Sequence, residues 1–352
     1  MEQNKKKNFF ARHKVLTVIL SLLTVVAIAA SITLPILYNV VFTVPLDEMP
    51  DRKSEGLVPT DEEVANSPHY KHIMIFGVDG AGGNFSLFDT PNSDRVFSQG
   101  SINENGMAEY PTISAQNWAS MFTGVTAQKH QFTNGKASVF LKIFDKYPTF
   151  FKIHAQNDNQ ATFYSAVTWI PINLGLIEPM IWGMTMDTCY FGTAGDKDDI
   201  YVDRTVKDHV IERLKNHADT IVFTHFDQVD EAGHIHGRTS AQYEQAIKTI
   251  DGYVGEIYDA YVEKGIADET LFILASDHGH KESGGHGGED PLEKQATLAV
   301  YGGKGDIIQG TSGKYVSHDL ASIVLYALGD KQPDYFDGRV PTNLFASLQR
   351  NI

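Results

Sequence analysis

The chain has 352 residues, more than the ~250–300 residues that one hydrophobic core usually holds. Hydrophobic residues make up 42% of it and charged residues 21%, a balance that excludes wholesale disorder. The net charge of −15 argues against a protein that coats nucleic acid, because such binding depends on basic side chains that neutralise phosphates. Cys189 is the one cysteine, which excludes an intrachain disulfide framework and a cysteine-rich zinc site.

The N-terminal region is typical of a membrane anchor. Residues 15–42 contain no Asp, Glu, Lys or Arg, and a membrane-spanning helix needs ~20 such residues. Residues 1–14 are basic and the downstream flank is acidic, so we expect a cytoplasmic tail followed by a translocated chain. A cleaved signal peptide is the alternative, with small residues at 27–29. We favour the anchor, because the apolar run continues well past that site, beyond the ~7–15 residues of a signal peptide's hydrophobic region. Both interpretations place the remainder outside the cytoplasm.

A linker is expected next. Residues 43–69 are acidic and contain Pro45, Pro50, Pro59 and Pro68, which is typical of an extended stalk. The compact catalytic domain is then expected at residues 70–347, a length that suits one large core.

Apolar runs and helical patterns alternate along this domain. Buried strands are predicted at 72–78, 161–166, 221–224, 271–276 and 296–301, and helices at 114–123, 198–216, 240–264 and 318–328. Long helices between buried strands require crossover connections. The sequence therefore predicts an α/β fold with a mostly parallel central sheet and helices on both faces.

Residues that could hold a metal follow three of the predicted strands. They are three carboxylates and three imidazoles: Asp79, Asp230, His234, Asp277, His278 and His286. An Asp after a strand is more often a turn former than a ligand, so each residue alone is weak evidence. Open α/β sheets bind ligands at the carboxyl ends of their strands, and the six together predict a metal site there.

Two further histidines compete for these roles: His236 with His234, and His280 with His286. Gly233 favours His234, because glycine lets the backbone turn so that His234 and the carboxylate four residues before it reach one ion.

Ser114 is the candidate nucleophile. It stands where the helix predicted at 114–123 begins, and a helix N-terminus presents free amides to an anion. The alternative is that Ser114 only caps the helix. Thr112 is the competing hydroxyl. The order strand, Asp79, loop, Ser114, helix brings the two side chains to one sheet edge and favours the functional interpretation.

Six segments carry a family resemblance: FGVDGAG, PTISAQNWASMFTG, AQKHQFTNG, DQVDEAGHIHG, SDHGHKESGGHGG and HDLASIVLYALG. In this order, across residues 72–345, they resemble the alkaline phosphatase superfamily, most closely its type I phosphodiesterase/nucleotide pyrophosphatase branch. The resemblance implies an alkaline-phosphatase-like domain that binds two divalent metal ions. Zinc is the usual metal of this branch, and the same ligand types also suit manganese.

The resemblance also assigns roles to residues. It implies a first ion held by Asp79, Ser114, Asp277 and His278, and a second ion held by Asp230, His234 and His286. Ser114 matches the position of the nucleophile. Asn117 matches an asparagine that helps to hold a phosphate oxygen.

Departures from the family pattern weaken a preference for nucleotides. Ile113 and Ala115 stand where the animal nucleotide enzymes have a lysine and a base-stacking phenylalanine. Trp118 and Trp169 are candidate pocket residues, although aromatic side chains at such spacings are more often core. The sulfatase signature is absent, and no arginine lies within residues 111–124, which favours diesters over monoesters.

These patterns predict a metal-dependent phosphoric-ester hydrolase that acts outside the cytoplasm. The expected reaction is that of a phosphodiesterase or nucleotide pyrophosphatase, with in-line attack through a phospho-Ser114 intermediate. The alternative is a phosphomonoesterase, or a transferase that moves a phospho-headgroup between membrane lipids or glycans. A non-catalytic binding protein ranks third. The expected partners are a phosphodiester, nucleotide or lipid-linked phosphate substrate and the membrane, with no obligate protein partner.

Overall fold

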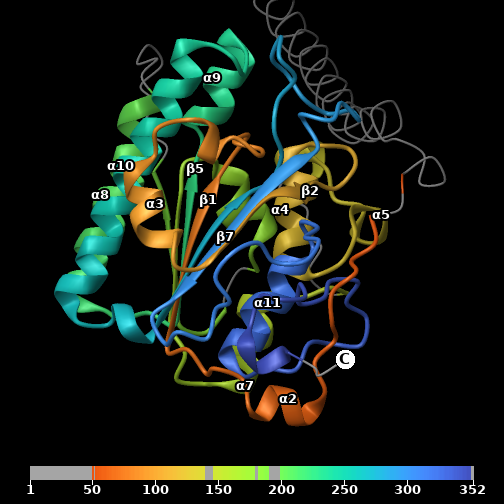
Figure 1. Ribbon diagram of the computed structural model, residues 1–352, viewed down its shortest axis with the longest axis vertical. Coiled ribbons are helices and arrows are strands. Elements are labelled where there is room, and N and C mark those ends of the chain that lie inside the picture. The colour runs from red at the N-terminus through yellow and green to blue at the C-terminus, as the bar shows by residue number, and fades with distance from the viewer. Residues whose placement is uncertain (1–49, 51, 139–145, 179–180, 190–198, 350–352) are drawn as a thin grey trace, which may run out of the picture. The chain divides into compact units, whose positions relative to one another are not determined.

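The computed structural model describes residues 50, 52–138, 146–178, 181–189 and 199–349 (Figure 1). The predicted cytoplasmic tail, the anchor at 15–42 and the first part of the predicted stalk lie outside these residues. Within the described ranges, no helix is both long enough and apolar enough to cross a bilayer.

The strands are β1 (His72–Val78), β2 (Ser101–Met107), β3 (Phe163–Val167), β4 (Met184–Thr188), β5 (Ile221–Phe226), β6 (Thr270–Ser276) and β7 (Gln295–Gly302). The α-helices are α2 (Asp61–Ala65), α3 (Pro91–Phe97), α4 (Ser114–Thr123), α5 (Ala127–His130), α6 (Asn134–Ser138), α7 (Phe150–Asn157), α8 (Asp199–Asn216), α9 (Gln228–His236), α10 (Ala241–Lys264) and α11 (Asp319–Leu328). Shorter helical turns are η2 (Phe85–Leu87), η3 (Ile172–Leu176), η4 (Ala267–Glu269) and η5 (Ala346–Leu348).

The described strands form one sheet in the order β2-β7-β6-β1-β5-β3-β4. The strands from β6 to β4 in this order are parallel, whereas β7 is antiparallel to both β6 and β2. The predicted α/β fold with a mostly parallel sheet is therefore confirmed for this domain. The sheet is mixed because a loop without a crossover helix connects β6 to β7, and such a connection returns the chain antiparallel.

Helices cover both faces of the sheet (Figure 1). Along β1, Ile73 and Ile75 join a core cluster with residues of α4, α7 and α11, whereas Met74 and Phe76 join a second cluster with residues of α3, α8 and α10. The side chains of a strand alternate between faces, so a strand with apolar residues throughout must be covered on both sides.

The described part of the predicted stalk packs against the domain. Leu57 pairs with Val340 in an isolated bridge, and Val64 of α2 is buried. The acidic residues at 61–63 form the first turn of α2, where negative charge is favourable, and Thr60 and Glu63 make a capping box. This acidic run therefore forms the first turn of a helix within the region predicted as a stalk.

Candidate metal centre

The sheet register brings the first two carboxylates together. Val78, the last residue of β1, pairs with Ser276, the last residue of β6. The residues that follow are Asp79 and Asp277, so both carboxylates leave neighbouring parallel strands at the same level. On the other side of β1, Val78 pairs with Phe226 of β5, and α9 begins two residues later.

The four residues expected at the first ion lie within contact of one another. Ser114 Oγ is 3.4 Å from Asp79 Oδ1 and 3.2 Å from His278 Nε2. His278 Nε2 is also 3.4 Å from Asp79 Oδ1 and 3.3 Å from Asp277 Oδ2. All four side chains are buried. The nucleophile candidate therefore lies among the oxygen and nitrogen atoms that would ligate this ion.

The three residues expected at the second ion also converge. His234 Nε2 and His286 Nε2 are 3.0 Å apart, and Asp230 places Oδ2 3.3 Å from the first nitrogen and Oδ1 3.5 Å from the second. Nδ1 of His286 donates to the carbonyl oxygen of Thr112 at 2.6 Å, which leaves its Nε2 as the lone-pair nitrogen. The competitor His236 is exposed at the end of α9.

The other competitor, His280, packs behind the second cluster. Its Nε2 lies 2.9 Å from Asp230 Oδ1, and the ring is fully buried. Two glycines make room for this ring. A Cβ at Gly80 would lie 2.7 Å from His280 Nε2, and one at Gly233 would lie 2.5 Å from Nε2 and Cδ2. Gly233 lies inside α9, so it does not provide the backbone turn that we expected. A residue without a side chain is required here because the His280 ring packs against it.

The charge balance of the centre suits divalent cations. Among the described residues, the ion pairs of Asp79, Asp230 and Asp277 are all with histidines. Asp277 Oδ2 is buried without a hydrogen-bond partner, and burial together with the charge of Asp79 raises the pKa of Asp277 well above its usual range. Burial lowers the pKa of His278 to about 3, so this ring is a neutral donor. Clustered carboxylates and imidazoles are suitable ligands for zinc or manganese.

Two buried side chains support Asp79 from behind. Trp118 Nε1 donates to Asp79 Oδ2 at 3.0 Å, and His225 Nε2 lies 2.9 Å from the same oxygen. Trp118 is fully buried in α4, where it orients Asp79, and its role in a substrate pocket stays a prediction. Trp169 is half-buried, with its ring centroid 6.4 Å from that of His225. Sequence reasoning missed His225, because a histidine inside an apolar strand gives no pattern of its own.

The helix that carries Asp230 and His234 is held at its start by Asp203 of α8. The Asp203 carboxylate accepts from the backbone N–H groups of Asp227 and Gln228 at 3.0 and 2.9 Å, and from Thr168 Oγ1 at 2.5 Å. Burial raises the pKa of Asp203 to about 6, although these hydrogen bonds act in the opposite direction.

Asn117 does not face Ser114 in this structure. Its Oδ1 accepts from the N–H of Glu109 at 2.7 Å and from Ser317 Oγ at 3.2 Å, and its Nδ2 donates to the carbonyl oxygen of Ile113 at 3.1 Å. These bonds brace the backbone that leads to Ser114. The phosphate-binding role of Asn117 stays a prediction.

Asn134 also contacts the start of α4. Its Oδ1 accepts from the backbone N–H of Ala115 at 3.0 Å, beside Ser114. Asn134 belongs to the segment AQKHQFTNG, which carries part of the family resemblance, but the sequence alone did not identify it as a site residue. Its position in that segment was the one indication of a role.

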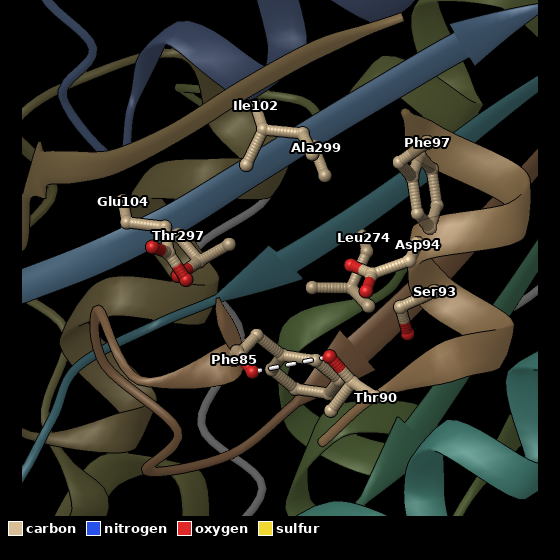
Figure 2. A pocket seen from close by; sticks show the side chains of 10 residues that line it. All are labelled: Phe85, Thr90, Ser93, Asp94, Phe97, Ile102, Glu104, Leu274, Thr297 and Ala299. Atoms are coloured by element: carbon tan, nitrogen blue, oxygen red, sulfur yellow. Dashed lines mark hydrogen bonds between the residues drawn. The ribbon is translucent and has the colours of Figure 1, made fainter. Parts of the chain in front are cut away.

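A small cavity lies between α3 and the β6, β7 and β2 strands (Figure 2). Apolar residues such as Phe97 and Leu274 line it together with Ser93, Asp94 and Glu104. Its volume of about 30 Å³ suits about one water molecule and is too small for a phosphodiester.

The fold and the two Asp/His clusters define an α/β protein of the alkaline-phosphatase-like class with a candidate two-metal centre. The chain belongs to the type I phosphodiesterase/nucleotide pyrophosphatase family, whose profile matches residues 73–318. This match confirms the resemblance read from the sequence motifs.

Named relatives show how far the similarity extends. GPI ethanolamine phosphate transferase 2 of Kluyveromyces lactis is 24% identical over 294 residues, which cover 80% of this chain and 34% of that protein. Murine ectonucleotide pyrophosphatase/phosphodiesterase 5 aligns with a TM-score of 0.60 at 12% identity, over 75% of this chain and 96% of that one. The lipoteichoic acid synthase LtaP of Listeria monocytogenes aligns with a TM-score of 0.58 at 12% identity, over 81% and 78%. The two structures support the fold alone.

Proposed function

We propose that this protein cleaves a phosphodiester outside the cytoplasm through a phosphoserine at Ser114, and passes the phospho-headgroup to an acceptor hydroxyl. The observation that carries the proposal is the position of Ser114 Oγ at the start of α4, 3.4 Å from Asp79 and 3.2 Å from His278. Similarity over 80% of the chain to a protein named as an ethanolamine phosphate transferase favours transfer over hydrolysis. Nucleotide pyrophosphatase or phosphodiesterase activity, with water as the acceptor, is the second candidate and is supported by the family profile.

Divalent ions held by the two clusters would lower the pKa of the Ser114 hydroxyl and polarise the phosphoryl oxygens. Ser114 then forms the Oγ–P bond while the P–O bond to the leaving alcohol breaks, and the alcohol takes up the proton that the serine gave up. The acceptor hydroxyl attacks from the vacated side, breaks the Oγ–P bond and returns a proton to Ser114. The product is the phospho-headgroup ester of the acceptor, or the free headgroup phosphate when water attacks.

The start of α4 is the proposed site for the phosphoryl oxygens. A helix N-terminus carries a partial positive charge, which favours an anion. The side chain of the N-cap residue, Ile113, is apolar and makes no cap hydrogen bond. Asn134, oriented by its bond from the N–H of Ala115, is the amide side chain that we assign to this anion.

A lipid-linked substrate is favoured by where the chain reaches this site. Arg52 makes an ion pair with Glu289, three residues after His286, and its Nε donates to the carbonyl oxygen of Ala108 at 3.1 Å. Figure 1 shows the segment before α2 rising from that helix toward α5. An anchor at residues 15–42, as the sequence predicts, would tether this centre to a membrane that holds such substrates.

The test uses the purified full-length chain with a chromogenic phosphodiester and the matching monoester, with and without an added alcohol acceptor. We expect turnover of the diester and a phosphopeptide that contains Ser114. With the alcohol present, a new diester of that alcohol should form and the amount of the hydrolysis product, a phosphate monoester, should fall. Ser114→Ala should lower turnover at least ~10³-fold and abolish the phosphopeptide and the ester formation. Ser120→Ala, in the same helix, should not. Preference for the monoester would overturn the proposal, and indifference to the alcohol would favour hydrolysis.

A further inference from the structure

The segment that precedes the nucleophile contacts the glycine-rich loop after β6 through one residue. The hydroxyl of Thr112 accepts from the N–H of Gly287 at 2.9 Å and donates to the carbonyl oxygen of Gly288 at 3.2 Å. The carbonyl oxygen of Thr112 accepts from His286 Nδ1 at 2.6 Å. Thr112 is fully buried, so water does not compete for these bonds.

The glycine-rich loop needs such support. Gly284, Gly285 and Gly287 all have positive φ, at 88°, 77° and 110°. Glycine has more backbone conformations available than any other residue, so fixing a glycine-rich loop in one conformation loses much conformational entropy. This loop nevertheless carries His286, whose Nε2 must meet His234 and Asp230. The three bonds to Thr112 fix the loop directly beside that histidine.

We propose that Thr112 is a positioning residue for the second metal ion, and that its hydroxyl determines how tightly this ion is held. The inference rests on the proposed two-ion centre. The carbonyl oxygen of Thr112 sets the tautomer of His286, and the hydroxyl keeps the loop where that bond can form. Loss of partners that orient a metal-ligating histidine typically weakens metal affinity ~10–100-fold.

The first cluster should respond differently. Asp79 and Asp277 follow paired ends of adjacent strands, and His278 follows Asp277 directly. None of these three depends on the glycine-rich loop for its backbone position, and Ser114 is the first residue of α4. The ring of His278 does stack on that of His286, with the centroids 3.8 Å apart. Removal of the Thr112 hydroxyl is therefore expected to weaken the second ion much more than the first, whereas a general loss of packing would weaken both alike.

The experiment uses Thr112→Val, which keeps the shape and removes the hydroxyl, and Thr112→Ser, which keeps the hydroxyl. Thr123→Val is the matched control, because Thr123 is also buried, at the far end of α4, and its hydroxyl donates to the carbonyl oxygen of Ala119 at 2.6 Å. The full-length proteins are stripped with a chelator and titrated with Zn²⁺ in metal buffers. Bound ions per chain are then counted at each free concentration.

We expect wild type, Thr112→Ser and Thr123→Val to bind two ions with unchanged affinities. Thr112→Val should bind the second ion ~10–100-fold more weakly and the first with much less change, with activity recovered at high Zn²⁺. Equal affinities in Thr112→Val and wild type, equal weakening of both ions, or the same effect in Thr123→Val would overturn the inference and leave the proposed function standing. A wild-type chain that binds no second ion would overturn both.

Discussion

Replacement of Gly233 by alanine should destabilise this protein, although the same change in the interior of a helix is ordinarily favourable. Alanine in a helix is about 1 kcal/mol better than glycine. At position 233 the added Cβ would lie 2.5 Å from two atoms of the His280 ring, well inside contact distance. That ring is fully buried and bonded to Asp230, so it cannot move aside freely.

The size of the effect follows from these two opposing contributions. Overpacking in a filled interior costs about 1–3 kcal/mol, and the gain in helix propensity offsets about 1 kcal/mol of it. We expect a net loss of up to about 2 kcal/mol in the free energy of unfolding for Gly233→Ala. When His280→Ala is introduced as well, the clash disappears, so the two changes should couple by about 1–3 kcal/mol.

Gly252→Ala is the control, because Gly252 lies inside α10 and no atom would lie within 4 Å of its added Cβ. That variant should gain up to about 1 kcal/mol. Urea unfolding in the presence of a chelator measures all variants without the added stabilisation of bound ions. If Gly233→Ala is as stable as Gly252→Ala, or behaves the same with and without His280, then the steric reasoning is wrong.

Three further predictions concern the site. Ser114→Ala should lower turnover at least ~10³-fold, by analogy with other nucleophile deletions. Acid-quenched peptide mapping should find no phosphate on the variant. Phosphate on Thr112 in the wild type would identify that hydroxyl as the nucleophile. Asp277→Ala should lose one of two ions by elemental analysis whereas His236→Ala keeps both, and retention of both ions by the first variant would contradict the ligand assignment. Folding raises the pKa of Asp203 from 3.8 to about 6, so the stability from this group is full below pH 3.8 and is lost as the pH rises through 6, by up to about 3 kcal/mol. Urea unfolding from pH 4 to 7 should show this decline in the wild type relative to Asp203→Asn, and parallel profiles would refute it.

The elements that the sequence predicted are those with an internal pattern. The run at 72–78 and the helix at 240–264 were recognisable because apolar residues continue or recur at helical spacing. The strands β2 and β4 were not predicted. Their sequences, SINENGM and MTMDT, carry many polar residues. The two strands are the outermost of the described sheet, where a continuous apolar run is not required.

The candidate ligands were predictable because strand ends collect at one sheet edge, so their order in the sequence indicated their convergence. Their supporting contacts were not. Three of these contacts are hydrogen bonds of 2.9–3.0 Å to residues distant in the chain, made by His225, His280 and Asn134. No local spacing in the sequence encodes such contacts. The role of Gly233 was misread for the same reason, since the ring that it accommodates comes from another loop.

The pairing of Val78 with Ser276 has a consequence for how this enzyme class can diversify. Neighbouring strands lie ~4.8 Å apart, so the paired backbones of the two strands fix the distance between Asp79 and Asp277. Insertions in the loops cannot stretch that spacing, whereas a slip of one residue between the strands would turn Asp277 to the opposite face. The loops around the centre can therefore vary without changing this spacing, and engineering of the proposed specificity can be confined to them while the strand ends stay untouched.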